Sequence, residues 1–346
     1  MDEPPALIVA GPTCSGKSAL AMALAERLHG TVINADSMQV YRELRVLTAR
    51  PSPAEEAAVP HRLFGVRPAA EAGSVAWWRG AALRAMAEAW VPPHPGPLPG
   101  GEGGKEPSPP GRGLGEGGRA GRLPILCGGT GLYFAALTHG LADIPDAGRA
   151  ARETARGLLA KLGPAALHGR LAEVDPATAA RLRANDGQRI ARAYEVWLGT
   201  GTPLADWQAR PGRKAPWRFA AILLAPPRAE LRGAIAGRFA AMLEAGALEE
   251  VRALLALGLD PALPAMRAHG VPELSAYLRG EITLDEAARR AELVTGQYAK
   301  RQATWYRHHD LAPADRTHTI HARYAGQAQL SEREMGDLVN FIERVS

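Results

Sequence analysis

Short apolar runs alternate with amphipathic stretches along the first part of the chain. Residues 6–10 (Ala-Leu-Ile-Val-Ala) have the length of a buried strand, and residues 19–28 have the composition of a helix. Further strands are expected at 31–33 and 123–127, with a helix at 77–89 between them. Strands that alternate with helices are typical of a parallel sheet, so we expect an α/β fold.

The pattern changes in the second half of the chain. From residue 149 to 195 the strand signal disappears, and Ala, Leu, Arg and Glu recur at helical spacing. The apolar run 219–224 then indicates a return to the sheet, which makes the helical block an insertion within the α/β core. We therefore expect three parts: residues 1–140 as the first part of the core, 141–210 as the helical insert, and 211–346 as the completion of the core with C-terminal helices.

Three helical stretches are expected after the insert, at 229–257, 284–307 and 332–345. Ser331 and Glu334 have the spacing of a capping box at the start of the last one. Four apolar residues form one stripe along this helix: Met335, Leu338, Val339 and Ile342. The stripe predicts a packed face with no other role.

Residues 91–122 interrupt this organisation. Of these 32 residues, 11 are Gly and 8 are Pro, and the tetrad Gly-Glu-Gly-Gly occurs at both 101–104 and 115–118. Because such a segment cannot form a core, we expect a flexible insertion. A segment without function is favoured over a partner-binding one, so deletion of 93–120 is expected to leave activity intact.

Composition limits the class of protein only broadly. The 346 residues suit two domains, and 41 Lys and Arg against 36 Asp and Glu are compatible with a polyanionic partner without identifying one. Cys14 and Cys127 are too few for a disulfide framework and lack metal-ligand spacing. The acidic N-terminus and the short apolar run behind it predict neither a secretory signal nor a membrane span. We expect a cytoplasmic monomer without membrane contact.

The strongest chemical motif lies between the first expected strand and the first expected helix. It matches G-x-x-x-x-G-K-[ST] with the residues Gly11, Pro12, Thr13, Cys14, Ser15, Gly16, Lys17 and Ser18. Backbone amides and a helix N-terminus would form a positive concavity for a phosphate chain. Lys17 would neutralise the outer phosphate, and Ser18 would offer its hydroxyl to Mg²⁺. The alternative is a fortuitous glycine-rich turn.

A phosphate loop alone does not identify the reaction, because kinases, ATPases and GTPases share it. The chain has no Asn-Lys-x-Asp motif for a GTPase, and the strand at 123–127 is followed by Gly-Gly where an ATP-driven motor would have a carboxylate. Asp36 follows the strand at 31–33 and would therefore lie at the edge of the sheet where ligands bind. Its carboxylate could accept a proton from a nucleophile. The alternative is a helix N-cap formed by Asp36 or Ser37.

Seven segments, taken in order, resemble those of one family. They are 11–18, 34–41 (NADSMQVY), 48–51 (TARP), 128–133 (GGTGLY), 185–190 (NDGQRI), 200–204 (TGTPL) and 297–302 (QYAKRQ). The chain is similar to the tRNA dimethylallyltransferases, also called isopentenyl-pyrophosphate tRNA transferases. The resemblance covers the chain except for 91–122 and the C-terminal end. It implies a P-loop NTPase-like core with a parallel sheet and an inserted all-helical, tRNA-binding domain.

The resemblance also implies a reaction and its residues. Dimethylallyl pyrophosphate would donate its prenyl group to N6 of adenosine 37, immediately 3′ of the anticodon, in tRNAs that read codons beginning with U. The implied base is Asp36. The growing charge on the leaving group would be stabilised by Lys17, the loop amides, Ser18 through Mg²⁺, and Arg238. Thr13 would contact the leaving group or the base pocket. Without the resemblance, Arg238 would be interpreted as a surface residue of a helix.

The second implied substrate is the anticodon stem-loop of tRNA. The adenine must leave its stack to reach Asp36, and Gln39 is expected to read an edge of that base. The implied tRNA contacts are Asp36, Ser37, Met38, Gln39, Thr130, Arg152, Gln188, Arg189, Ile190, Ala191, Arg192, Arg267, Ala268, His269, Gly270, Val271 and Pro272. Lys300, Arg301 and Arg307 could meet phosphates or form a solvated face, while Trp305 and Tyr306 are expected in the core.

Three other functions are compatible with parts of the sequence. An enzyme that prenylates free AMP or ADP would share the fold but would need no RNA-binding domain. An ATP-dependent phosphotransferase would carry an adenine-lid signature, and none follows the sheet. A non-catalytic RNA-binding protein would not need Lys17, Ser18 and Asp36 together.

Overall fold

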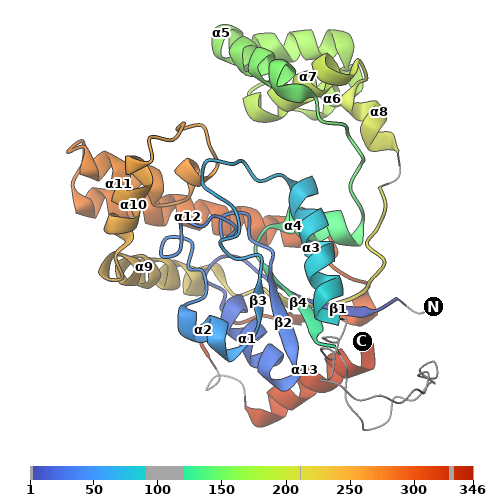
Figure 1. The fold of residues 1–346 in the computed structure, drawn as a ribbon, viewed down its shortest axis with the longest axis vertical. Helices are drawn as coiled ribbons and strands as arrows, with labels where there is room; N and C mark the ends of the chain where they lie inside the picture. The colour runs from blue at the N-terminus through green and yellow to red at the C-terminus, as the bar shows by residue number, and fades with distance from the viewer. Residues whose placement is uncertain (1–2, 91–120, 211, 327–330, 346) are drawn as a thin grey trace, which may run out of the picture. The chain divides into compact units, whose positions relative to one another are not determined.

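A computed structural model describes residues 3–90, 121–210, 212–326 and 331–345. The chain forms two compact units (Figure 1). One consists of the chain up to Thr138 together with everything from Pro216 onward, and the other is His139–Ala215. The expected helical insert, 141–210, lies inside the second unit. The expected flexible insertion at 91–122 falls outside the described residues, apart from its last two.

The first unit contains a six-stranded parallel sheet with the strand order β3-β2-β4-β1-β5-β6. Its strands are β1 (Pro5–Ala10), β2 (Gly30–Asn34), β3 (His61–Arg62), β4 (Leu123–Gly128), β5 (Arg218–Leu224) and β6 (Thr317–Ile320). In the centre, Val9 of β1 lies opposite Cys127 of β4 on one side and Ile222 of β5 on the other. Because these strands are buried, they appear in the sequence as continuous apolar runs.

The helices of this unit are α1 (Lys17–Arg27), α2 (Pro53–Ala58), α3 (Val75–Trp90), α4 (Gly131–Thr138), α9 (Arg228–Glu244), α10 (Ala247–Ala256), α11 (Val271–Leu278), α12 (Leu284–Tyr306) and α13 (Glu332–Val345). Of these, α1, α3, α12 and α13 begin and end within two residues of the expected limits, whereas α2, α4 and α11 were not expected. The expected stretch 229–257 is divided into α9 and α10 by Gly246, whose φ of 95° cannot continue a right-handed helix. No helix among the described residues is long and apolar enough to cross a membrane.

The two ends of the chain share one core. Met335, Leu338 and Ile342 of α13 are buried in the same cluster as Leu20 and Leu24 of α1. Figure 1 shows α1 and α13 side by side although they come from opposite ends of the sequence. The expected capping box of α13 is confirmed, because Ser331 and Glu334 exchange side-chain and backbone hydrogen bonds at 3.2 and 2.8 Å. The apolar stripe of this helix is therefore a packing face, as expected.

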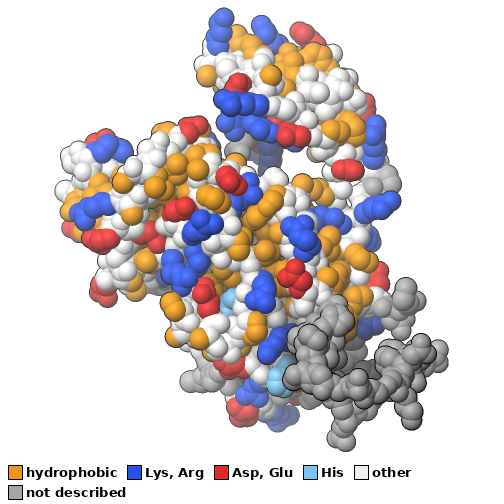
Figure 2. All heavy atoms as spheres, viewed as in Figure 1, with side chains coloured by type: hydrophobic (Ala, Val, Ile, Leu, Met, Phe, Trp, Pro, Cys, Tyr) orange, Lys and Arg blue, Asp and Glu red, His pale blue; other side chains and the backbone are white. Residues whose placement is uncertain are grey.

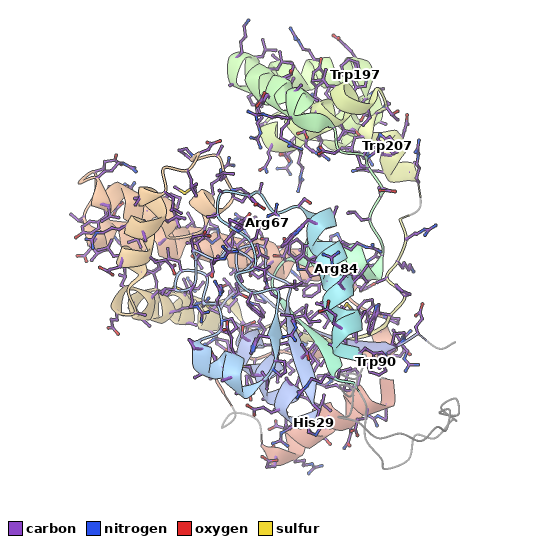
Figure 3. All side chains as sticks on the ribbon, viewed as in Figure 1. His29, Arg67, Arg84, Trp90, Trp197 and Trp207 are labelled. Carbon is purple, nitrogen blue, oxygen red and sulfur yellow. The ribbon has the colours of Figure 1, made fainter. Side chains whose placement is uncertain are left out.

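Helices form the described part of the second unit, as the sequence indicates, apart from an isolated β-bridge between Leu141 and Arg213 and the segments that connect the helices. Its helices are α5 (Gly148–Val174), α6 (Pro176–Arg181), α7 (Gly187–Thr200) and α8 (Leu204–Ala209). The core is formed where Leu167 and Leu171 of α5 meet Ile190 of α7. Trp197 packs against this core, and Trp207 donates a hydrogen bond to Thr200 at 3.3 Å (Figure 3).

Candidate active site

A cavity of about 540 Å³ lies where β1 and β2 end. It is lined by the phosphate loop from Thr13 onward and by residues 36–39, which follow those two strands. Further walls come from residues 47–50, α9, α12 and Arg323. Ligands of open parallel sheets bind at this edge. The loop and Asp36 converge on one crevice, as expected, whereas Thr130, which was expected in the same crevice, does not line the cavity.

The phosphate loop is tightly packed around Gly16. The φ of Gly16 is 90°, and a Cβ at this position would lie 1.8 Å from the carbonyl oxygen of Tyr324, so only glycine fits. Lys17 is buried, with Nζ 3.4 Å from the carbonyl oxygen of Pro12. Burial lowers the pKa of Lys17; Asp36 acts to raise it, and Arg238 to lower it. A buried ammonium that is only partly compensated favours an anionic ligand.

Gln302, a buried residue of α12, fixes the phosphate loop through hydrogen bonds. Its Oε1 accepts a hydrogen bond from the backbone N–H of Thr13 at 2.8 Å, and its Nε2 donates one to the carbonyl of Gly129 at 2.8 Å. The Thr13 amide is therefore not available to a phosphate. By contrast, the amides of Lys17 and Ser18 in the first turn of α1 have no helical acceptor, as at any helix N-terminus. These are the amides that can receive a phosphate.

Two arginines flank Cys14 of the loop. Nη1 of Arg238 is 3.8 Å from the Cys14 sulfur, and Nε of Arg323 donates to the Cys14 carbonyl at 2.9 Å. Both arginines line the cavity, so Arg238 lies where the resemblance implies. Charged side chains of the cavity wall number five cations (Lys17, Arg50, Arg238, Arg267 and Arg323) against two carboxylates (Asp36 and Glu55). This excess of positive charge suits a polyanion.

Asp36 lies on the wall of the same cavity. Its Oδ1 accepts a hydrogen bond from the backbone N–H of Met38 at 2.9 Å, and its own N–H donates to Asn34. The helix N-cap alternative is wrong, because no helix begins between Asp36 and α2. The carboxylate instead closes a local turn with one oxygen. Its second oxygen has no hydrogen-bond donor in the described part of the chain and can accept a proton.

Thr130 supports residues 35–37 without lining the cavity. Its Oγ1 accepts the backbone N–H of Ser37 at 3.0 Å, and its own N–H donates to Ala35 at 3.2 Å. Tyr298 of α12 does line the cavity, and sequence reasoning assigned it no role. Burial raises the pKa of Tyr298, which hydrogen-bonds with Thr130 and packs edge-on against His269 at 5.0 Å. Its phenol therefore stays protonated and can donate a hydrogen bond.

Gln39 is less available to a base than the sequence suggests. Its Nε2 donates to the carbonyls of Thr48 and Ala49 at 2.9 and 3.0 Å. Both amide hydrogens are thus used to hold the cavity wall, and only Oε1 is left as an acceptor. If Gln39 reads an edge of the base, it can do so only by accepting a hydrogen bond at Oε1.

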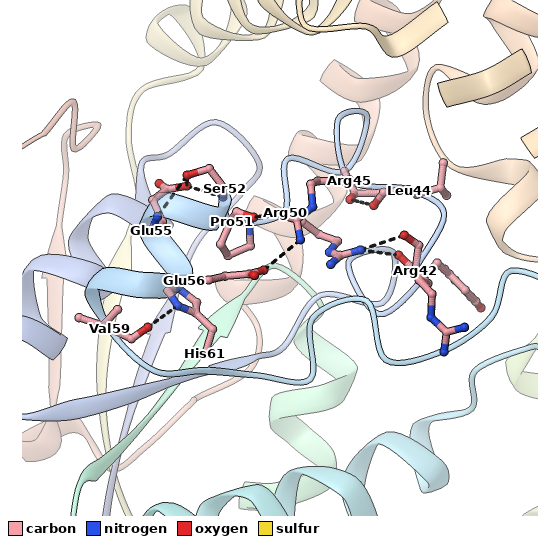
Figure 4. Close-up of polar contacts among 12 residues, drawn as sticks. Arg42, Leu44, Arg45, Arg50, Pro51, Ser52, Glu55, Glu56, Val59 and His61 are labelled. Carbon is pink, nitrogen blue, oxygen red and sulfur yellow. Dashed lines mark hydrogen bonds and ion pairs between the residues drawn. The ribbon is translucent and has the colours of Figure 1, made fainter. Parts of the chain in front are cut away.

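The wall beyond Gln39 is braced by polar contacts within residues 42–62 (Figure 4). Arg45 donates to the carbonyl of Pro51 at 2.8 Å, and Arg50 donates to that of Arg42 at 3.0 Å. Glu250 of α10 accepts the backbone N–H groups of three consecutive residues, Arg45, Val46 and Leu47, at 2.6 to 2.9 Å. A single glutamate inside a helix has no sequence signal, which is why Glu250 was missed.

The expected RNA-contacting segment 267–272 divides into two parts. Arg267, Ala268 and His269 line the cavity, and burial lowers the pKa of His269. Gly270, Val271 and Pro272 lead into α11; a Cβ on Gly270 would lie 2.7 Å from Leu47, and Val271 is buried. The cavity-facing contribution of the segment therefore comes from its first three residues.

The remaining expected RNA contacts belong to the helical unit. Gln188, Arg189 and Arg192 are exposed on α7, whereas Ile190 and Ala191 are buried in the core. Arg192 and Arg152 both pair with Glu195, and Arg189 pairs with Asp186. Figure 2 shows Lys and Arg side chains at the surface of this unit with acidic side chains between them.

Of the two aromatic residues of α12 that were expected in the core, Tyr306 is buried, whereas Trp305 is half-buried and stacks on His309.

The site fits a magnesium ion only together with a phosphate ligand. Among the described residues, no group of three His, Cys, Asp or Glu could hold a metal. Ser18 lines the cavity, and its side chain also hydrogen-bonds with Cys127. Mg²⁺ commonly takes most of its ligands from substrate phosphates and water, and one hydroxyl suits that mode of binding.

Cys14 and Cys127 are both free and buried, and burial raises the pKa of Cys127 to about 11.

The fold and this cavity define a P-loop NTPase-like protein with a cationic site and a carboxylate at its rim. The family model described as IPP transferase matches residues 39–94 and 115–309. The chain belongs to this family, the tRNA dimethylallyltransferases.

Curated relatives match over the full length. The chain is 59% identical to the tRNA dimethylallyltransferase of Granulibacter bethesdensis, over 99% of both chains. It is 57% identical to that of Gluconobacter oxydans, over 98% of this chain and 95% of the relative. Among solved structures, the tRNA isopentenylpyrophosphate transferase of Bacillus halodurans matches with a TM-score of 0.63 and 29% identity, covering 99% and 96%. A eukaryotic dimethylallyltransferase acting on tRNA shares the fold, with a TM-score of 0.77 at 22% identity, covering 99% and 80%.

Proposed function

We propose that this protein transfers the dimethylallyl group of dimethylallyl pyrophosphate to N6 of adenosine 37 in tRNAs that read codons beginning with U. The observation that carries the proposal is the presence of Lys17 and Asp36 in one cationic cavity of a chain that belongs to the tRNA dimethylallyltransferase family. The products are N6-isopentenyladenosine and pyrophosphate.

The diphosphate of the donor binds at the phosphate loop. The free amides at the start of α1 receive phosphate oxygens, and Lys17 neutralises the outer phosphate. Arg238 approaches from α9 beside Cys14. These groups gain most when the C–O bond breaks, because negative charge then grows on the leaving diphosphate. Thr13 lines the cavity beside them, and its side chain is available to the leaving group.

The acceptor amine needs help from a base because its lone pair is delocalised into the adenine ring. As N6 attacks the allylic carbon, a C–N bond forms, the C–O bond breaks with its electron pair going to diphosphate, and an N6 proton moves to Asp36. The hydrogen bond from Met38 fixes the carboxylate while leaving one oxygen for this proton. Oε1 of Gln39 would accept a hydrogen bond from the other N6–H.

We propose Mg²⁺ as the cofactor. Ser18 would hold it through its hydroxyl together with diphosphate oxygens and water. When bound, the ion supplies charge neutralisation to the leaving group. The phosphate loop itself is of the nucleotide-binding type, but here its ligand is the diphosphate of a prenyl donor and ATP is not a substrate.

The anticodon stem-loop contacts both units. In the helical unit, Arg152, Gln188, Arg189 and Arg192 offer exposed donors to the RNA backbone. In the core unit, Arg267 and His269 line the cavity that receives the unstacked adenine. We place the enzyme in the cytoplasm, where buried free thiols stay reduced. We propose that it acts as a monomer.

Prenylation of free AMP or ADP is the second candidate, since the same chemistry would serve it. The unit at His139–Ala215 disfavours it, because a nucleotide acceptor gives a separate helical unit with exposed arginines no purpose.

One assay tests both candidates. The protein is incubated with labelled dimethylallyl pyrophosphate, Mg²⁺, and either bulk tRNA or AMP. Label is expected on tRNA alone. Label on AMP alone, or on neither acceptor, would contradict the proposed function.

A further inference from the structure

Arg323 occupies an unexpected position at the phosphate loop. It follows β6, 309 residues after Cys14, and its Nε donates to the carbonyl of Cys14 at 2.9 Å. The neighbouring Tyr324 donates its backbone N–H to the carbonyl of Ser15 at 2.9 Å. Two consecutive loop carbonyls are thus held by two consecutive residues from the C-terminal part of the chain.

The backbone around Arg323 is anchored on both sides. Its own N–H donates to Glu230 of α9 at 3.3 Å, and Tyr324 is buried against Gly16. The side chain is therefore directed by its surroundings toward the loop and does not extend freely into solvent. It lines the same cavity as Lys17 and Arg238.

The terminal groups of this guanidinium are uncommitted. Only Nε has a hydrogen-bond acceptor among the described residues, so the two NH₂ groups have none. Arginine offers five N–H donors in a planar fork that matches phosphate oxygens. A guanidinium held by Nε with both NH₂ groups free is in the orientation that binds two oxygens of one phosphate.

We propose that Arg323 binds the diphosphate of the prenyl donor, as a third cation besides Lys17 and Arg238. This inference rests on the proposed function for the nature of the ligand, a diphosphate ester. The three cations reach the phosphate loop from three separate elements: α1, α9 and the segment after β6. In the transfer step, electrons of the breaking C–O bond pass to the diphosphate, and Arg323 stabilises the charge that develops there.

The test measures binding of inorganic pyrophosphate with Mg²⁺ by calorimetry, for the full-length wild-type protein and for Arg323→Gln. Glutamine removes the charge and the fork. We expect the Kd for pyrophosphate to rise about 10- to 100-fold, as for the loss of a hydrogen-bonded charged partner. The KM for dimethylallyl pyrophosphate should rise in parallel, and the KM for tRNA should not change. An unchanged Kd in a folded variant would overturn the proposal.

Arg333→Gln is the matched control, because Arg333 is an exposed residue of α13 in the same C-terminal part and is not on the cavity wall. Its pyrophosphate affinity should equal that of the wild type. If Arg323→Gln fails to fold, Arg323→Lys provides the test. Lysine keeps the charge but lacks the planar fork in which Nε bonds the Cys14 carbonyl while the two NH₂ groups bond two oxygens of one phosphate, so a several-fold weaker Kd is expected and wild-type affinity would refute the role.

The same measurements separate this inference from the proposed function. If the wild type binds pyrophosphate, Arg323→Gln binds it weakly and tRNA is not prenylated, the diphosphate role of Arg323 stands and the proposed function fails. If the wild type prenylates tRNA and Arg323→Gln has an unchanged affinity for pyrophosphate, the proposed function stands and the role of Arg323 fails.

Discussion

Gln302 accepts the backbone N–H of Thr13 across 289 positions of sequence. The same side chain donates to Gly129 at the end of β4, so one amide joins the phosphate loop, the sheet and α12. Helix α12 also carries Tyr298, which lines the cavity. Gln302 is thus a positioning residue that fixes the phosphate loop relative to α12, which forms part of the cavity wall.

Gln302→Ala should destabilise the protein by about 1–3 kcal/mol, because it leaves the Thr13 amide and the Gly129 carbonyl without partners. The KM for dimethylallyl pyrophosphate should rise as the loop loses its support. Chemical denaturation and steady-state kinetics check both effects. Gln297→Ala, an exposed glutamine of the same helix, should change stability by less than about 0.5 kcal/mol. Equal stability of the two variants would contradict the bridging role.

Asp36→Asn separates the base from the turn. The asparagine oxygen can still accept the Met38 N–H, so the local turn and the stability should be retained. The amide cannot accept the N6 proton, and kcat should fall about 10²–10⁴-fold. Single-turnover kinetics with saturating tRNA measure this step. Near-normal turnover would leave Asp36 with only its role in the turn.

Glu250 holds the wall at residues 45–47 through three backbone N–H groups. Glu250→Ala removes the two carboxylate oxygens that accept all three hydrogen bonds and should cost about 1–3 kcal/mol of stability. Glu249→Ala is the control, since Glu249 is exposed and, among the residues that the structure describes, pairs only with Arg252. Thermal unfolding of both variants gives the comparison, and a similar loss in each would show that the three hydrogen bonds contribute little.

The stability of the protein should depend on pH through His269. Burial lowers the pKa of His269 below its usual value near 6.5, with Glu273 acting in the opposite direction. Because the unfolded chain then binds the proton more tightly, the free energy of unfolding has its full value, as far as His269 is concerned, above pH 6.5. This contribution is lost as the pH falls through 6.5 toward the lower pKa of the folded state. Denaturation of the wild type and His269→Gln between pH 7 and 5 should show a smaller loss in the variant. Identical pH dependence would exclude His269 as a contributor.

The sequence predicted the central strands and the donor site because their signals are local. Buried strands such as β1 read as apolar runs, and the phosphate motif is contiguous. The edge strands were missed for physical reasons: β3 has two residues, and β6 reads Thr-His-Thr-Ile with no apolar run. Edge strands need fewer apolar residues because part of each is open to solvent.

Three residues that reach the site across long sequence separations, Gln302, Glu250 and Arg323, were not assigned roles in advance. Gln302 lies in segment 297–302, which resembles the family, but the resemblance implied no role for it. Glu250 and Arg323 are single polar residues that belong to no motif and no periodic pattern. Their importance follows from tertiary contacts alone, with Thr13, with residues 45–47 and with Cys14. Gln39 shows the converse, since its sequence position suggested base recognition while its amide is committed to the wall.

The packing of Tyr324 over Gly16 has a consequence for synthesis on the ribosome. The phosphate motif is translated before the residues that close over it, because Arg323 follows Cys14 by 309 residues. A nascent chain that ends before residue 323 has the complete motif but lacks the contacts of Arg323 and Tyr324. The donor site is therefore finished only after residues 323 and 324 have been translated, and nascent chains that are shorter than this should not sequester the prenyl donor.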